Sequence, residues 1–241
     1  MKQGLNCLLL ILTLLGPKTT NAQVFNAGIG GNNTKNLLER LDADVLRHNP
    51  DLVIVMVGTN DMLNSKKMIS YRNYAHNLEE IIQRIRVKGA EVVLMTPPPV
   101  DSVYLFQRHD RNAYREIPNV KMDSTRQIIK KLARKDGLGC IDFFQIFSDM
   151  GLPEHNVDLF FRNERNSGAK DGVHPTALGY RFIAETVFDY LKMNALLEKG
   201  QKLVCFGDSI THGAGTKNRG IVTGQNYPAV LSALIQQHFQ K

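Results

Sequence analysis

A serine near the end of the chain has neighbours that suit a nucleophile. Ser209 lies in Gly207-Asp208-Ser209, directly after the short apolar run Leu203–Phe206. A serine between a buried strand and a helix lies where backbone N–H groups converge, so a negative oxygen formed there would be stabilised. A simple helix cap explains Asp208 and Ser209 equally well, so this segment alone does not establish the chemistry.

Asp171 and His174 could supply the base that such a serine requires. They are three residues apart, so a turn or a first helical coil places both side chains on one side. A carboxylate beside the second ring nitrogen would orient the histidine while the histidine takes the serine proton. An ordinary cap before Pro175 would also explain this pair. The remaining histidines lack such a neighbourhood, although His212 follows the serine segment closely enough to line the same site.

Two further segments could stabilise the negative oxygen of a tetrahedral intermediate. Gly31 belongs to a glycine-rich turn after the strand-like run 24–27, and small residues let a backbone N–H approach a reacting oxygen. Asn60 follows the apolar run Leu52–Val57, although a turn and a cap would also favour an asparagine there. We expect Asn60 and the N–H groups of Gly31 and Ser209 to form an oxyanion hole.

The sequence favours chemistry without a cofactor or a metal. The glycines at 28–31 resemble a dinucleotide turn, but Asn33 replaces the third glycine of Gly-x-Gly-x-x-Gly. The chain has no Cys-x-x-Cys pair and no His-Glu-x-x-His segment. Cys140 and Cys205 lie in apolar runs and are interpreted as buried small hydrophobes, and the sequence leaves open whether they form a disulfide.

Strand-like runs and helical patterns alternate along the chain and would bring these residues together. Strands are expected at 24–27, 52–57, 91–95, 140–144 and 203–206, and helices around 37–45, 71–87, 123–135, 177–191 and 229–235. This alternation predicts an α/β fold, with a mostly parallel sheet covered by helices on both faces. Residues 100–120 are interpreted as an irregular loop, which either overhangs the site or forms a surface excursion.

The N-terminal segment is typical of an export signal. Residues 5–15 form an apolar run that is too short to span a bilayer, and Thr20-Asn21-Ala22 follows. We predict a signal peptide at 1–22 and a single domain at 23–241, secreted or periplasmic and without stable membrane insertion. The net charge is +7, but the lysines and arginines are scattered along the chain, with no long basic tract and no tryptophan. This distribution does not indicate a nucleic-acid surface.

Together, the four segments resemble the sequence blocks of the SGNH hydrolases, also called the GDSL esterase/lipase superfamily. Residues 207–211 resemble its nucleophile block, 26–31 its oxyanion-glycine block, 58–61 its oxyanion-asparagine block and 171–175 its Asp-x-x-His block. The resemblance implies a three-layer, flavodoxin-like, five-stranded parallel sheet. It also implies a catalytic triad of Ser209, His174 and Asp171, with Gly31, Asn60 and Ser209 as the oxyanion hole.

The order of these blocks differs from the family pattern. The serine block usually comes first, whereas here it comes last. The sequence therefore looks circularly permuted, with residues 197–202 as a new joint and new ends at Gln23 and Lys241. Permutation is tolerated where chain ends lie close together at a surface.

The resemblance implies a serine esterase, and the signal-like segment at 1–22 implies that it is secreted. We expect it to remove short acyl groups, above all O-acetyl groups on carbohydrates. The expected partner is a small-molecule or glycan ester. A lipase, lysophospholipase or acyl-thioesterase with the same residues, and a non-catalytic carbohydrate-binding protein with the same fold, stay open as alternatives. The sequence does not indicate the oligomeric state.

Overall fold

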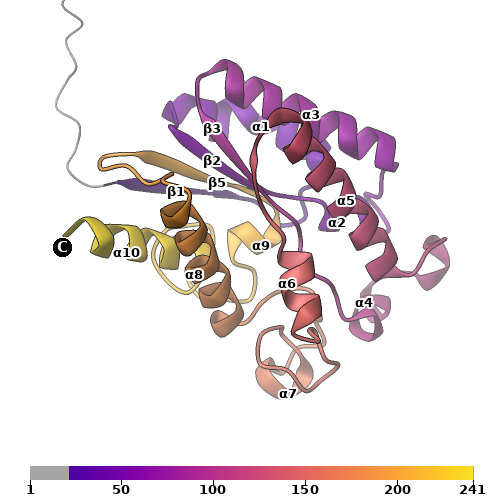
Figure 1. The fold of residues 1–241 in the computed structure, drawn as a ribbon. Helices are drawn as coiled ribbons and strands as arrows, with labels where there is room; N and C mark the ends of the chain where they lie inside the picture. The colour runs from indigo at the N-terminus through magenta and orange to yellow at the C-terminus, as the bar shows by residue number, and fades with distance from the viewer. Residues whose placement is uncertain (1–21, 241) are drawn as a thin grey trace, which may run out of the picture.

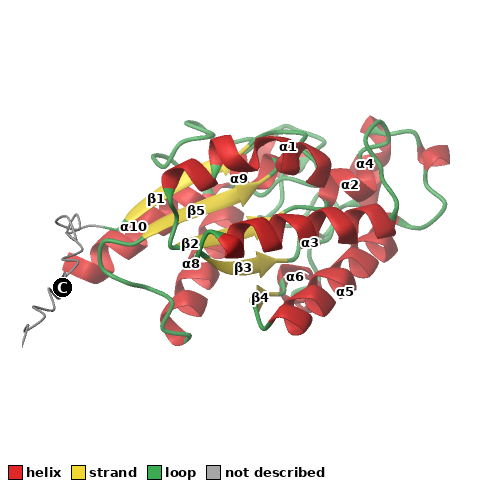
Figure 2. Ribbon diagram, turned by 90° about the horizontal axis from the view of Figure 1, so that it is seen from above, coloured by secondary structure: helices red, strands yellow, loops and turns green. Residues whose placement is uncertain are grey.

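The computed structural model describes residues 22–240 and contains a five-stranded parallel sheet between two layers of helices (Figures 1 and 2). The strands are β1 (Gln23–Gly28), β2 (Leu52–Met56), β3 (Glu91–Met95), β4 (Gly139–Ile141) and β5 (Lys202–Gly207). They pair in the order β1-β5-β2-β3-β4, and every pair is parallel. The predicted α/β class and parallel sheet are confirmed. The predicted signal peptide falls on residues 1–22, of which 1–21 lie outside the described part.

Ten α-helices lie within residues 22–240. They are α1 (Thr34–Asp44), α2 (Thr59–Leu63), α3 (Tyr71–Val87), α4 (Ser102–Arg108), α5 (Pro118–Asp136), α6 (Phe143–Asp149), α7 (Glu164–Ser167), α8 (Ala177–Met193), α9 (Ser209–His212) and α10 (Tyr227–Gln240). Short 3₁₀ turns occur at Leu46–His48 and Arg111–Ala113. Among these described helices, none is both long and apolar enough to cross a bilayer.

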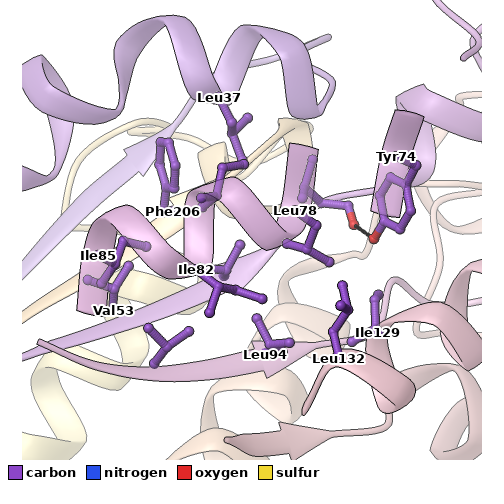
Figure 3. Close-up of a cluster of buried hydrophobic side chains, with 14 of the residues drawn as sticks. Leu37, Val53, Tyr74, Leu78, Ile82, Ile85, Leu94, Ile129, Leu132 and Phe206 are labelled. Carbon is purple, nitrogen blue, oxygen red and sulfur yellow. Dashed lines mark hydrogen bonds between the residues drawn. The ribbon is translucent and has the colours of Figure 1, made fainter. Parts of the chain in front are cut away.

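The sheet separates two hydrophobic clusters because its central strands are buried on both faces. One cluster joins the sheet to α1, α3 and α5, and Figure 3 shows its side chains, with Leu37, Leu78 and Ile129 reaching from the three helices. The other joins the opposite face to α6, α8 and α10. In β2, Val53 faces the first cluster and Ile54 the second, so the unbroken apolar run serves both layers. Each fully buried aliphatic side chain stabilises the folded state by about 1.5–3 kcal/mol relative to an exposed one.

The predicted strand at 140–144 is wrong in its second half. β4 ends at Ile141, and Phe143 begins α6. Asp142 turns the chain, because its carboxylate accepts the Gln145 N–H at 3.3 Å as a helix cap and receives the Arg126 guanidinium at 2.8 Å. A run of apolar residues cannot by itself distinguish a strand from the start of a buried helix.

The segment 100–120, expected to be irregular, is largely helical. Asp101 caps α4 by accepting the Val103 N–H at 2.9 Å. The helix expected from residue 123 begins at Pro118, whose fixed φ suits the first helical position.

Cys140 and Cys205 differ in burial. Both thiols are free, Cys205 is buried in β5, and Cys140 is only partly buried, which corrects the expectation that both are buried. Burial raises the pKa of the Cys205 thiol to about 12 and that of Cys140 to about 11.

Candidate active site

The structure brings Ser209, His174 and Asp171 into one hydrogen-bonded line. The His174 Nε2 atom lies 2.9 Å from the Ser209 Oγ atom, and its Nδ1 atom lies 2.9 Å from both carboxylate oxygens of Asp171. Ser209 begins α9 directly after β5, whereas the other two residues lie in the turn before α8. The geometry is that of a nucleophile beside a base whose far nitrogen faces a carboxylate.

Two paired glycines allow the Ser209 turn to lie close to the sheet. Gly28 and Gly207 are register partners at the ends of β1 and β5. A Cβ atom on Gly28 would lie 2.2 Å from the His212 backbone nitrogen, and one on Gly207 would lie 2.3 Å from the Met56 carbonyl oxygen. Only glycine fits at these two positions, because any side chain would push α9 away from the strands.

Asp208 holds the same turn from inside the protein. Its carboxylate accepts the Ile210 N–H at 2.9 Å and caps α9, while its Oδ2 atom is buried without a hydrogen-bond partner among the described residues. Burial raises the pKa of Asp208 to about 6. Its side chain therefore positions the turn and is itself excluded from solvent.

The Asp171 turn is fixed by its own side chain. The Asp171 Oδ1 atom accepts the N–H groups of Val173 at 3.2 Å and His174 at 3.1 Å, in addition to the imidazole. Gly172 has φ +66°, and a Cβ atom there would lie 2.7 Å from the Asp101 Cβ atom. This glycine is required both for the left-handed backbone and for close packing against the start of α4.

The Asp171 carboxyl is strongly stabilised in its ionised form. Burial alone would raise its pKa, but the hydrogen bond and charge of His174 and the charge of Arg108 lower it to about 2. An ionised carboxylate at this position can stabilise positive charge on the imidazole during proton transfer.

Asn60 and Gly31 lie at the same cavity as Ser209. The Asn60 Nδ2 atom donates to the Asn32 carbonyl oxygen at 3.0 Å, and its Oδ1 atom accepts from Asn64 at 3.3 Å. This orientation leaves the second N–H of the Asn60 amide for a ligand. Gly31 has φ +74°, and Lys67 donates to its carbonyl oxygen at 2.7 Å.

The cavity above Ser209 has a volume of about 290 Å³ and one apolar wall. Leu63, Leu105 and Val173 form that wall. The expected residues Gly31, Asn60, His174 and Ser209 line the remainder, together with Thr59, Asn64, Arg108, His109 and Ala214.

Several of these lining residues could not be identified individually from the sequence. Leu105, Arg108 and His109 come from α4 and its end, within the segment interpreted as an irregular loop. The signal available was the position of this segment after β3, because loops at the carboxyl ends of parallel strands surround ligands. His212 lies away from the cavity, with its Nδ1 atom 3.0 Å from the Gly28 carbonyl oxygen. Among residues 22–240, no three histidine, cysteine or acidic side chains converge as metal ligands would.

The comparisons with known proteins place this architecture in a family. The profile of the GDSL-like Lipase/Acylhydrolase family matches residues 11–182, which is most of the chain. The chain therefore belongs to this family of ester-bond hydrolases. The match ends before Ser209.

Three curated relatives are similar over part of their length. An uncharacterized lipoprotein, YqeF, of Bacillus subtilis is 30% identical over 46% of this chain and 52% of its own. An acetylxylan esterase of Geobacillus stearothermophilus is 23% identical over 67% of this chain and 68% of its own. An arylesterase of Vibrio mimicus is 30% identical over 68% of this chain and 67% of its own. The chain thus spans about half the length of the lipoprotein and two thirds of the esterases.

A solved structure shares the fold. The lipase/acylhydrolase from Enterococcus faecalis superposes with a TM-score of 0.54 at 22% identity, covering 70% of this chain and 74% of that one. This similarity confirms the fold of SGNH hydrolases, which was inferred from the four sequence segments.

Proposed function

We propose that the protein is a secreted serine esterase that removes short acyl groups, above all acetyl groups, from carbohydrates. The observation that carries the proposal is the line from Ser209 through His174 to Asp171, which opens into a small cavity with one apolar wall. Each part of this arrangement has a role in ester hydrolysis.

In the first half of the proposed reaction, Ser209 Oγ attacks the ester carbonyl carbon while His174 Nε2 accepts its proton. The imidazolium then protonates the leaving alcohol, and an acyl-serine remains. In the second half, His174 takes a proton from water, the resulting hydroxide attacks the acyl group, and the acid is released as Ser209 recovers its proton. Asp171 holds the imidazole and stabilises its positive charge in both halves.

The oxyanion formed in each half needs donors that are already in place. We assign this role to the free N–H of the Asn60 amide and to the backbone N–H groups of Gly31 and Ser209. Support comes from their position around one cavity and from the bonds that orient the Asn60 amide before any substrate binds.

The cavity supports a short acyl group. Its volume of about 290 Å³ must hold the acyl group and part of the alcohol, and drug-sized ligand sites start at about that size. The wall formed by Leu63, Leu105 and Val173 suits a methyl group, while Arg108 and His109 offer polar contacts to a sugar. The acetylxylan esterase relative supports a carbohydrate substrate.

We also propose that the chain is a circular permutant of the usual family order. If numbering began at β5, the sheet order would read 2-1-3-4-5, which is the flavodoxin-like order. The family match covers residues 11–182 and stops before the serine block. The end of α10 and the start of β1 lie at the same end of the molecule (Figures 1 and 2), where a former connection could have joined them.

Export is the third part of the proposal. It is supported by the signal-like sequence of residues 1–22 and by the similarity to a lipoprotein. N-terminal sequencing of protein collected outside the cell should begin at Gln23, and a start at Met1 would contradict it.

Acetate release from acetylated xylooligosaccharides would test the activity, beside p-nitrophenyl esters of increasing acyl length and with Ser209→Ala as control. We expect Ser209-dependent acetate release and a steep loss of activity beyond short acyl chains. Activity that rises with acyl length would instead indicate a lipase or thioesterase. Absence of Ser209-dependent activity on both sets would favour a non-catalytic binding protein.

A further inference from the structure

Two guanidinium groups flank the carboxylate that faces His174. The Arg108 Nη2 atom donates to the Asp171 backbone carbonyl oxygen at 2.6 Å and lies 3.5 Å from its Oδ1 atom. The Arg162 Nη1 atom lies 3.3 Å from the Oδ2 atom. Each carboxylate oxygen of Asp171 therefore faces one arginine as well as the imidazole.

Both arginines are held by backbone that is bonded to the catalytic turn. The Arg162 backbone N–H donates to the His174 carbonyl oxygen at 2.9 Å, and Gly172 donates to the Arg162 carbonyl oxygen at 2.8 Å. The Asp101 N–H, at the start of α4, donates to the Gly172 carbonyl oxygen at 2.8 Å, which fixes the helix that ends at Arg108.

The Arg162 side chain also fills a space left by a glycine. Gly215 has φ +88°, and a Cβ atom there would lie 2.5 Å from the Arg162 Cδ and Nη1 atoms. The guanidinium thus lies directly against the backbone that follows the Ser209 turn. This packing fixes its distance from Asp171 and makes the contact more than an exposed ion pair.

The charges at this site have a defined consequence. A carboxylate paired with a histidine favours the imidazolium, because opposite charges attract at short range. Two cations on the same carboxylate offset that attraction and repel an imidazolium directly. The Arg108 charge favours the ionised form of Asp171, and the contacts of both arginines hold the carboxylate in place.

Resting on the proposed function, we propose that Arg108 and Arg162 are positioning residues of the triad. By holding Asp171 between them, they keep its carboxylate aimed at His174 and offset its attraction for an imidazolium. Neither arginine needs to touch the ester for this role.

Other charged or titratable groups surround the same turn and must be separated from this effect. They are His109 at the end of α4, the Asp101–His155 pair at its start, Tyr180 on α8 and Asp208 at α9. Two of these groups each feel one of the arginines. After burial, the charge of Arg108 contributes to the lowering of the pKa of His109, and the charge of Arg162 opposes the raised pKa of Tyr180. Arg162 lies on another segment, so a shift common to variants of both arginines cannot come from His109.

The test is the pH dependence of kcat/KM for p-nitrophenyl acetate between about pH 4 and 9. Arg108→Gln, Arg162→Gln and the double variant would be compared with the wild type. Arg115→Gln and Arg165→Gln are matched controls, because these exposed arginines lie on the same two segments and make no ion pair among residues 22–240. Circular dichroism would verify that each variant is folded.

We expect the acid limb of the profile to move to higher pH by about half to one unit in each single variant, and further in the double variant. At the alkaline plateau Arg162→Gln should keep activity within about tenfold of the wild type. Arg108 also lines the cavity, so for Arg108→Gln only the position of the acid limb is compared. Arg108→Lys retains the positive charge, and because this side chain is partly exposed the variant should fold. Its acid limb should therefore lie much closer to that of the wild type than the acid limb of Arg108→Gln does. The controls should follow the wild-type profile.

An unmoved acid limb in the Arg162→Gln and double variants, with or without a uniform loss of activity, would overturn the inference. A shift in the control variants would overturn it as well. The same assay on Ser209→Ala separates this outcome from failure of the proposed function. Activity that persists in Ser209→Ala would show that the proposed triad does not carry out the reaction.

Discussion

At the scale of single residues, Asp171 connects the chemistry to stability. Its carboxylate receives two backbone N–H groups, the imidazole of His174 and two guanidinium groups, all while buried. A buried carboxylate with so many donors contributes folding free energy only while it is ionised.

The first prediction concerns Asp171 and acid stability. Because its folded-state pKa is lowered from 3.8 to about 2, it stabilises the fold above its ordinary pKa, and this contribution of about 2 kcal/mol is lost as the pH falls from about 4 through 2. Urea unfolding should show Asp171→Asn less stable than the wild type at neutral pH, with the difference shrinking below pH 4. The exposed Asp189→Asn is the control. A constant difference down to pH 2 would contradict the assignment.

Asp208 changes the stability of the fold with pH in the opposite direction to Asp171, so the contributions of the two carboxyl groups can be separated. Burial raises its pKa to about 6, and its ionisation therefore lowers stability as the pH rises from about 4 through 6. The two carboxylates titrate in different windows.

The second prediction concerns Asn60 and the oxyanion. Asn60→Ala should lower kcat for acetyl esters by about 100- to 1000-fold with little change in KM, because the lost donor acts mainly in the transition state. Asn64→Ala removes one of the two bonds that orient the Asn60 amide, together with a bond from the Lys66 N–H, and should cause a smaller fall. Steady-state kinetics of both variants would check this. An Asn60→Ala enzyme within twofold of the wild type would remove Asn60 from the oxyanion hole.

The site residues differed in how far the sequence could indicate them. Asp171, His174 and Ser209 were suggested by residue type, by the three-residue spacing and by their places beside apolar runs, and the structure brings them together. Arg108 and His109 carry no such local pattern. Their places in the cavity depend on how α4 folds back toward the catalytic turn, which is decided by tertiary contacts.

At the scale of elements, the ends of β1 and β5 decide where the serine turn lies. The third prediction is that Gly28→Ala destabilises the protein by about 1–3 kcal/mol, because its Cβ atom would lie 2.2 Å from the His212 backbone nitrogen. Thermal unfolding would measure this. Gly30→Ala is the matched control in the same loop, since its Cβ atom meets nothing within 4 Å. Equal stability of the two variants would contradict the close packing of α9 on β1.

Element boundaries show why the sequence was only partly informative. The expected bounds of α3 and β3 agree with the structure because hydrophobic periodicity and flanking residues act together there. The apolar run at 140–144 is divided between β4 and α6 by Asp142, whose bonds to Arg126 and Lys130 are formed in the tertiary structure. No local pattern contains those contacts.

At the scale of the whole molecule, the order of the chain is separable from the arrangement of the site. β5 is last in sequence but lies between β1 and β2 in the sheet, which puts Ser209 beside residues contributed by the loops after these two strands. A fold depends on which strands are neighbours, and new chain ends are tolerated where the existing ends lie close together at the surface.

The fourth prediction follows from that separation. A chain in which Lys241 is joined to Gln23 by a short glycine-rich linker, and which is opened between Leu197 and Lys202, should fold and retain Ser209-dependent esterase activity. Circular dichroism and the acetyl ester assay would check it. The same linker with an opening inside β5 is the control that should not fold. If the first rearranged chain does not fold, the proposed permutation is contradicted.

Covalent labelling would show whether Ser209 is the nucleophile. A fluorophosphonate ester reacts with a serine only when that serine is activated as a nucleophile, and the adduct can be located by peptide mass spectrometry. We expect one adduct, on the peptide that contains Ser209, together with loss of esterase activity, and greatly slowed labelling in His174→Ala. An adduct on another residue, or esterase activity that survives complete labelling of Ser209, would contradict it.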